Sequence, residues 1–149
     1  MNDCSYRVGD VLSQALEIMA FLDLEPSGGQ ALSAEQALWS EIQFRGPREG
    51  TLVLIIGQHL ARLLAQTISA QDQVSARECL DAVQELTNVT CGLILPEIAL
   101  EQRDVFNMSV PQVHGTCTTE QIEAFLADPR TERYCVNDEE LAVRLALNP

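Results

Sequence analysis

The spacing of hydrophobic residues along the chain predicts four helices. Apolar residues recur every three or four positions in these stretches, which places them on one helix face. We expect Asp10 to cap the first helix, and Pro96 to end or kink the third. The predicted helices cover residues 10–24, 59–69, 75–95 and 119–126. The buried face of the third is expected to hold Leu80, Val83, Leu86, Thr90 and Ile94.

Alternating apolar and polar residues, together with one wholly apolar run, predict the strands. The run T-L-V-L-I-I at 51–56 predicts a strand buried on both faces. The turn residues G-P-R-E-G at 46–50 join this run to residues 38–44 in a first hairpin, and the turn at Asn137–Asp138 predicts a second. A further strand is expected to end at Pro111. The predicted strands cover residues 38–44, 51–56, 106–110, 133–136 and 140–147.

Helices that alternate with hairpins indicate the fold class. Single strands separated by helices would favour a parallel sheet, whereas hairpins pair their strands antiparallel. The order found here predicts an α+β fold in which long helices pack on an antiparallel or mixed sheet. Because no linker or low-complexity segment interrupts the pattern, we expect residues 1–149 to form a single domain.

The charge of the chain limits its partners. Nine basic residues stand against 22 acidic ones, so the formal net charge is −13. Nucleic acid and anionic membranes both attract clustered lysine and arginine, which this chain lacks. We therefore expect no nucleic acid and no membrane as a partner, and the charge otherwise favours solubility.

The sequence also predicts a cytoplasmic protein. The N-terminal segment has no basic stretch followed by an apolar run, and no uninterrupted apolar stretch of the chain is longer than residues 52–56. That stretch is far shorter than the roughly 20 residues that a membrane helix needs. The five cysteines form no C-x-x-C pair, and we expect them to be reduced, mostly buried thiols.

A stripe of polar residues on the third predicted helix is the main candidate for chemistry. Residues 81–92 read D-A-V-Q-E-L-T-N-V-T-C-G. Asp81, Glu85 and Asn88 follow one another at spacings of four and three, so their side chains share one helix face. Gly92 lies one turn beyond, where it costs up to about 1 kcal/mol of helix propensity and would let another backbone approach closely.

The commonest explanation of such a stripe is a solvated helix face, and spacing alone leaves this alternative open. Two further details favour a function. Asparagine is a mediocre residue for a helix interior, because its side chain competes for backbone hydrogen bonds. The stripe is also expected to lack a lysine or arginine partner four residues away, since Glu85 is followed there by Val89.

The stripe and one later residue resemble the signature of the CheX, CheC and FliY chemotaxis phosphatases. That signature reads Asp/Ser-x3-Glu-x2-Asn-x22-Pro, and Asp81, Glu85, Asn88 and Pro111 match it at every gap. The order of helices and hairpins fits the family over roughly residues 10–147. Other local features are also similar to CheX, namely E-L-T-N at 85–88, the later Gly92, P-x-V-x-G at 111–115 and M-A-F-L at 19–22.

The resemblance implies a phosphatase that hydrolyses the aspartyl phosphate of a CheY-like response regulator. It implies that Asn88 orients the attacking water, that Glu85 pairs with the regulator's active-site lysine, and that Asp81 supports the interface. Pro111 would shape its strand end beside the helix, and Gly92 would leave room for the partner. The chain would need no cofactor of its own, because the Mg²⁺ belongs to the regulator. A homodimer, formed through sheet edges, is also implied.

Two alternatives stand beside the enzyme. A non-catalytic module of the same fold would bind a response regulator without hydrolysing its phosphate, and a dimerising α+β domain would carry the stripe only as a solvated face. The intact pair of Glu85 and Asn88 favours the enzyme over the binding module. A weaker repeat in the first helix, with Ser13, Glu17 and Ala20 at the same spacing, lacks the asparagine and is not expected to be a second active site.

No other group of residues predicts a site. The two histidines, His59 and His114, are 55 residues apart and form no metal-binding pattern with the cysteines. The S-G-G-Q segment at 27–30 lacks the spacing of a phosphate-binding loop. We therefore expect no metal site on this chain.

Overall fold

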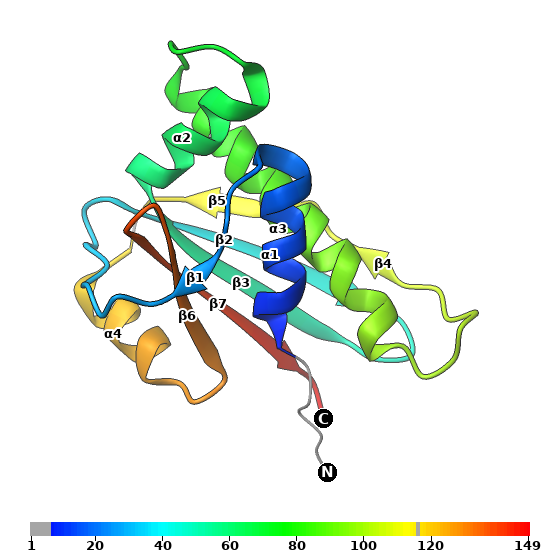
Figure 1. Ribbon diagram of the computed structural model, residues 1–149. Helices are drawn as coiled ribbons and strands as arrows, with labels where there is room; N and C mark the ends of the chain where they lie inside the picture. The colour runs from blue at the N-terminus through cyan, green and yellow to red at the C-terminus, as the bar shows by residue number, and fades with distance from the viewer. Residues whose placement is uncertain (1–6, 116) are drawn as a thin grey trace.

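An open antiparallel sheet with helices on both of its faces forms the fold (Figure 1). The structure is a computed structural model that describes residues 7–115 and 117–149. These two ranges contain four helices and seven strands. The helices are α1 (Val8–Ala20), α2 (Gln58–Ser69), α3 (Ala76–Ile98) and α4 (Thr119–Ala127). The strands are β1 (Glu25–Pro26), β2 (Ala37–Arg45), β3 (Gly50–Gly57), β4 (Asn107–Met108), β5 (Gln112–His114), β6 (Thr131–Val136) and β7 (Glu139–Leu147).

Two hairpins and one long pairing between them build the sheet. β2 pairs with β3, β6 pairs with β7, and the pairing of β3 with β7 joins the two hairpins. The sheet therefore runs in the order β1, β6, β7, β3, β2, and the outer edge of β2 carries both β4 and β5. Each pairing among the described strands is antiparallel, which confirms the predicted α+β class and selects the antiparallel form of the sheet.

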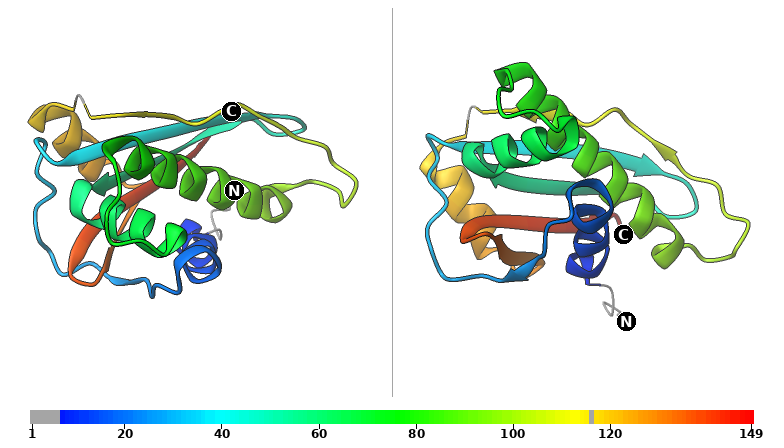
Figure 2. Two further views of the ribbon diagram at one scale, coloured as in Figure 1. Left: turned by 90° about the horizontal axis from the view of Figure 1, so that it is seen from above. Right: turned by 45° about the horizontal axis from the view of Figure 1, so that its top comes forward.

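Different helices cover the two faces of the sheet. α1, α2 and α3 lie together over one face, whereas α4 lies apart from them and packs on the other (Figure 2). Leu52, Leu54 and Ile56 of β3 belong to the core beneath the three helices, and Val53 and Ile55 belong to the core under α4. Successive side chains of a strand point to opposite faces, so the prediction that this strand is buried on both faces is confirmed.

α3 lies across β2 and β3 with one face in the larger core. Its helix begins at Ser75, whose side chain and that of Glu78 form a capping box. Of the five residues predicted on the inner face, Leu80 is only partly buried. The other four are buried, as predicted, namely Val83, Leu86, Thr90 and Ile94.

A buried pair of hydroxyl groups ties α3 to β2. Ser40 Oγ lies 2.6 Å from Thr87 Oγ1, and Thr87 Oγ1 donates to the carbonyl of Val83 at 2.9 Å. Because the single proton of Thr87 goes to Val83, Ser40 is the donor within the pair. An unpaired buried hydroxyl would cost about 1–3 kcal/mol, so these two residues favour one register of α3 over the sheet.

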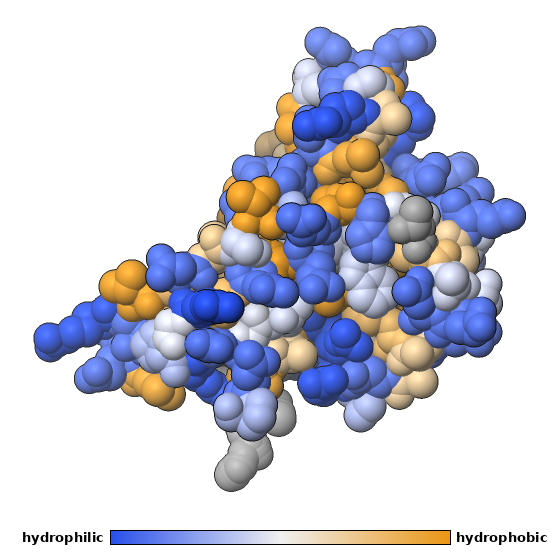
Figure 3. All heavy atoms as spheres, turned by 180° about the vertical axis from the view of Figure 1, so that it is seen from behind, coloured by the Kyte–Doolittle hydropathy of each residue, from blue (hydrophilic) through white to orange (hydrophobic). Residues whose placement is uncertain are grey.

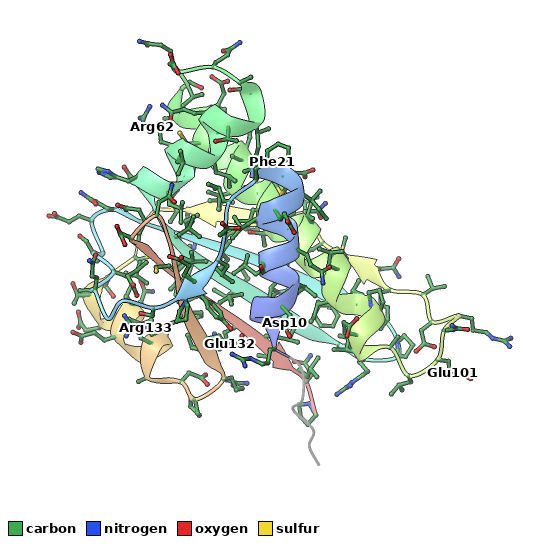
Figure 4. All side chains as sticks on the ribbon, in the orientation of Figure 1. Asp10, Phe21, Arg62, Glu101, Glu132 and Arg133 are labelled. Carbon is green, nitrogen blue, oxygen red and sulfur yellow. The ribbon has the colours of Figure 1, made fainter. Side chains whose placement is uncertain are left out.

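α1 is capped from a distant strand instead of by Asp10. The helix begins at Val8, so Asp10 lies in its first turn. The carboxylate of Glu132, on β6, accepts hydrogen bonds from the backbone N–H groups of Val8 and Gly9 at 3.0 and 2.9 Å (Figure 4). The helix ends before Phe21, whose φ of 55° is left-handed, four residues short of the prediction. The predicted cap and the predicted end of this helix were therefore wrong. The cap could not be predicted, because a carboxylate more than 100 residues away gives no local signal.

Other elements also differ from the prediction. α3 continues to Ile98, since Pro96 lies in its last turn and removes only one backbone hydrogen bond there. The strand predicted for 106–110 is confined to β4, and β5 follows after Pro111. β1 has only two residues, too few for a pattern to predict. No helix in the described ranges is long and apolar enough to cross a membrane.

The burial of α3 gives a test of its role as the anchor of the fold. We expect Leu86→Ala to lower the free energy of unfolding by about 2–5 kcal/mol, because it removes fully buried methyl groups and leaves a cavity. The control is Leu100→Ala, at a leucine that is 67% exposed, where a change within about 0.5 kcal/mol is expected. Urea denaturation measures both variants, and similar small changes in the two would contradict this role.

Candidate functional site

The polar stripe of α3 lines an open hollow in the surface. Asp81 and Glu85 are exposed and Asn88 is half-buried, and the three side chains lie in this one hollow, which has a volume of about 400 Å³. The opposite wall comes from the connection between β4 and β5. We call this feature the α3 hollow. Its lining residues are Asp81, Gln84, Glu85, Asn88, Met108, Ser109, Val110 and Pro111.

Glu85 and Asn88 are available to a partner. Within residues 7–115 and 117–149, neither side chain makes a hydrogen bond or an ion pair. They lie three residues apart on the helix, and the two residues between them in the sequence, Leu86 and Thr87, are buried. The hydroxyl of Thr87 is hydrogen-bonded to Ser40 of β2. A carboxylate and an amide are therefore presented together from one turn of a firmly held helix.

Asp81 differs from the other two because it has an ionic partner. Arg77 Nε lies 3.2 Å from Asp81 Oδ1, one turn earlier on α3. The expectation that the stripe lacks a basic partner was therefore wrong for Asp81, although it holds for Glu85. Both side chains are mostly exposed, so the ion pair contributes no more than about 1 kcal/mol and can be released when a partner binds.

A β-bulge shapes the opposite wall of the α3 hollow. Phe44 of β2 faces Met108, but Glu41, three residues earlier, faces Gln112, four residues after Met108. The outer strand therefore accommodates one extra residue between β4 and β5. Bulges are concentrated at sheet edges and next to active sites, where they turn side chains in a new direction.

Pro111 lies in this bulge and is tied to α3. Proline has no N–H to donate to the sheet, and a bulge on an outer strand is one of the few positions in a sheet that tolerate it. Pro111 is buried, and its carbonyl accepts a hydrogen bond of 2.9 Å from Nε2 of Gln84. The prediction that a strand ends at Pro111 was thus wrong, because the chain bulges there and continues as β5.

Gln84 was not predicted as part of the site, although its spacing places it there. It lies four residues before Asn88 and therefore on the same face of α3. Helical spacing could have found this position. It could not have found the hydrogen bond to Pro111, which spans 27 residues and an irregular segment. The wall residues Met108, Ser109 and Val110 were missed for the same reason.

Gly92 leaves open space beside the stripe. A Cβ atom at this position would meet no other described part of the chain within 4 Å. No other described segment of the chain therefore approaches Gly92 closely. The role of Gly92 at an interface with a partner stays a prediction. On α1, Glu17 is exposed but Ala20 is buried, so the weaker repeat presents an acid without an amide.

The four cysteines within the described residues do not form a second site. Cys79, Cys91 and Cys135 are buried, as expected, and Cys117 is half-buried. All four are free, whereas Cys4 lies outside the described residues. Burial raises the pKa of the Cys91 thiol to about 11, which keeps it protonated at neutral pH. In the part of the chain that the structure describes, no group of three or more His, Cys, Asp or Glu side chains could hold a metal ion.

Comparison with solved structures defines the fold as CheX/CheC-like. The chemotaxis protein CheX from Vibrio vulnificus superposes with a TM-score of 0.70 at 20% identity, over 95% of this chain and 96% of that one. The CheX–CheY–BeF3–Mg²⁺ complex from Borrelia burgdorferi gives a TM-score of 0.63 at 15% identity, over 95% and 96%. FliY from Thermotoga maritima gives 0.59 at 13% identity, over 93% and 83%.

The sequence of the chain places it within this class. The family of the chemotaxis phosphatase CheX matches residues 39–123, which is more than half of the chain and includes the whole α3 hollow. The protein therefore belongs to the CheX family, and the resemblance that the stripe indicated is confirmed. No curated protein sequence matches it.

The hydrogen bond between Gln84 and Pro111 gives a test of how the hollow is held. We expect Gln84→Met to raise hydrogen–deuterium exchange of the backbone amides at 109–110 and 112–114 about two- to tenfold, because it removes one hydrogen bond worth about 0.5–1.5 kcal/mol. Exchange within α3 should not change. Gln14→Met, at an exposed glutamine of α1, is the control. Unchanged exchange at 109–114 in Gln84→Met would show that the bond does not hold the wall.

Proposed function

We propose that this protein hydrolyses the aspartyl phosphate of a CheY-like response regulator. One observation carries the proposal: the side chains of Glu85 and Asn88, both without a partner among the described residues, share the open α3 hollow one turn apart on a rigid helix. Membership of the CheX family supports it. So does the similar Borrelia protein, which was solved in a complex with CheY, BeF3 and Mg²⁺.

The proposed reaction requires little covalent chemistry from this chain. A water molecule attacks the phosphorus, the bond between phosphorus and the aspartate carboxyl oxygen breaks, and inorganic phosphate leaves a free carboxylate on the regulator. Because an acyl phosphate is already reactive, the catalyst needs only to place the water opposite the breaking bond and to hold the two proteins in register. No bond to this chain forms at any step.

Two side chains divide these tasks in the proposal. The amide of Asn88 has an acceptor oxygen for the water and two N–H donors, so it can orient the water beside the phosphoryl group. The carboxylate of Glu85 pairs with the active-site lysine of the regulator and sets the register of the two proteins. Asp81 supports the interface at its edge. The Mg²⁺ belongs to the regulator, and no residue of this chain is assigned to it.

One copy of the chain supplies the whole site in this proposal. The stripe and the opposite wall of the α3 hollow both come from a single chain. The proposed reaction therefore does not require a second copy, and the homodimer that the family resemblance implies stays a prediction.

The first test follows the decay of a phosphorylated CheY-like regulator with and without this protein. We expect Asn88→Ala to reduce the accelerated rate about 10²–10³-fold, or roughly 2.7–4 kcal/mol, as for the loss of other preorganised groups. Glu85→Ala should also abolish most of the acceleration, because the two proteins lose their register. Glu17→Ala, at the exposed acid of the α1 repeat, is the control and should act as the wild type does.

The outcomes separate the enzyme from the binding module. If the wild type binds the regulator without accelerating the decay, the protein is a non-catalytic module. If Asn88→Ala keeps most of the activity, the amide has no part in the mechanism.

A further inference from the structure

The wall of the α3 hollow that faces the polar stripe carries exposed hydrophobic side chains. Val110 is 69% exposed and Met108 is 38% exposed, and both line the hollow. A single exposed hydrophobic residue needs no explanation. Here, however, two of them stand opposite Glu85 and Asn88 in the same hollow, where they contribute little to the core of this chain.

The bulge fixes the position of this wall. The backbone N–H of Ser109 donates to the carbonyl of Gln43 at 2.8 Å, and its Oγ accepts from the N–H of Gln43 at 3.0 Å. On the other side of Val110, the carbonyl of Pro111 is held by Gln84. Val110 therefore lies between two residues that are anchored to β2 and to α3, and it is presented without loose chain on either side.

We propose that Met108 and Val110 form a recognition wall that contacts an apolar surface of the regulator beside its phosphorylated aspartate. This inference rests on the function proposed above. The wall and the stripe line one hollow, so a partner that brings its phosphoryl group to Asn88 also covers Val110. The stripe performs the chemistry, and the wall supplies affinity for the correct partner.

The net charge of the chain explains why an apolar contact with the regulator would be useful. A net charge of −13 repels acidic groups of a partner, and salt screens the ionic contacts between the two proteins. Burial of apolar surface is insensitive to both effects. On the face seen from behind, groups of hydrophobic residues lie within a mostly hydrophilic surface (Figure 3).

The test measures binding and turnover in Val110→Ser. The probe for binding is a CheY-like regulator loaded with beryllofluoride and Mg²⁺, the combination present in the Borrelia complex. We expect Kd and KM to rise about tenfold, which corresponds to ~1.4 kcal/mol, whereas kcat stays within about twofold. The matched control is Val105→Ser, at a valine that is 76% exposed but lies outside the hollow, and it should bind as the wild type does.

Salt adds a second readout that a general loss of structure would not give. The ratio of Kd between Val110→Ser and the wild type should persist when the salt concentration is raised, because the lost contact is apolar. The corresponding ratio for Glu85→Ala should shrink, because its lost contact is ionic. Thermal unfolding of both valine variants should match the wild type, since neither side chain is buried.

Each outcome decides between the two proposals. Wild-type binding by Val110→Ser, equal weakening by Val105→Ser, or a fall in kcat without a change in Kd would overturn the recognition wall while leaving the phosphatase intact. If the wild type neither binds the regulator nor speeds its dephosphorylation, the proposed function fails and the wall fails with it.

Discussion

The burial of one face of α3 against the sheet is the constraint on which the site depends. Leu86, Ile94 and their neighbours bring the helix onto β2 and β3, and the hydroxyl pair of Ser40 and Thr87 selects its register. Once that face is committed to the core, the opposite face must point to solvent. Glu85 and Asn88 are therefore held in place by residues that are buried in the core.

The two walls of the α3 hollow solve different structural problems. The side chains of the stripe need a rigid support that fixes their direction, and a helix of 23 residues packed in the core provides it. The opposite wall needs side chains that turn away from the regular alternation of a strand, and a bulge at the sheet edge allows this. Gln84 connects the two, because it lies on the helix and holds the carbonyl of Pro111 in the bulge. Pro111, the proline of the signature, and the polar stripe of α3 are thus parts of one structure that Gln84 connects.

Local patterns in the sequence predicted most of the fold and half of the site. The hairpin of β2 and β3, the turn at Asn137–Asp138 and the face shared by Asp81, Glu85 and Asn88 all follow from helix and strand periodicity. The rest depends on contacts between distant residues. Glu132 caps a helix from the far end of the chain, and one extra residue in the outer strand changes its register without altering any local pattern. The chemical roles of Glu85 and Asn88 came from resemblance to a family, because spacing alone does not distinguish a reactive stripe from a solvated one.

The bulge has an evolutionary consequence. α3 can change little on its inner face, because each substitution there alters the packing of the core. The segment from Met108 to Val110 lies at the edge of the sheet, and its exposed side chains can vary without moving the helix. With the recognition wall proposed above, a duplicated copy of such a gene could acquire a new signalling partner by mutation in this short segment alone, while the inherited helix and its polar stripe stay as they were. Parallel signalling pathways could be insulated from one another in this way.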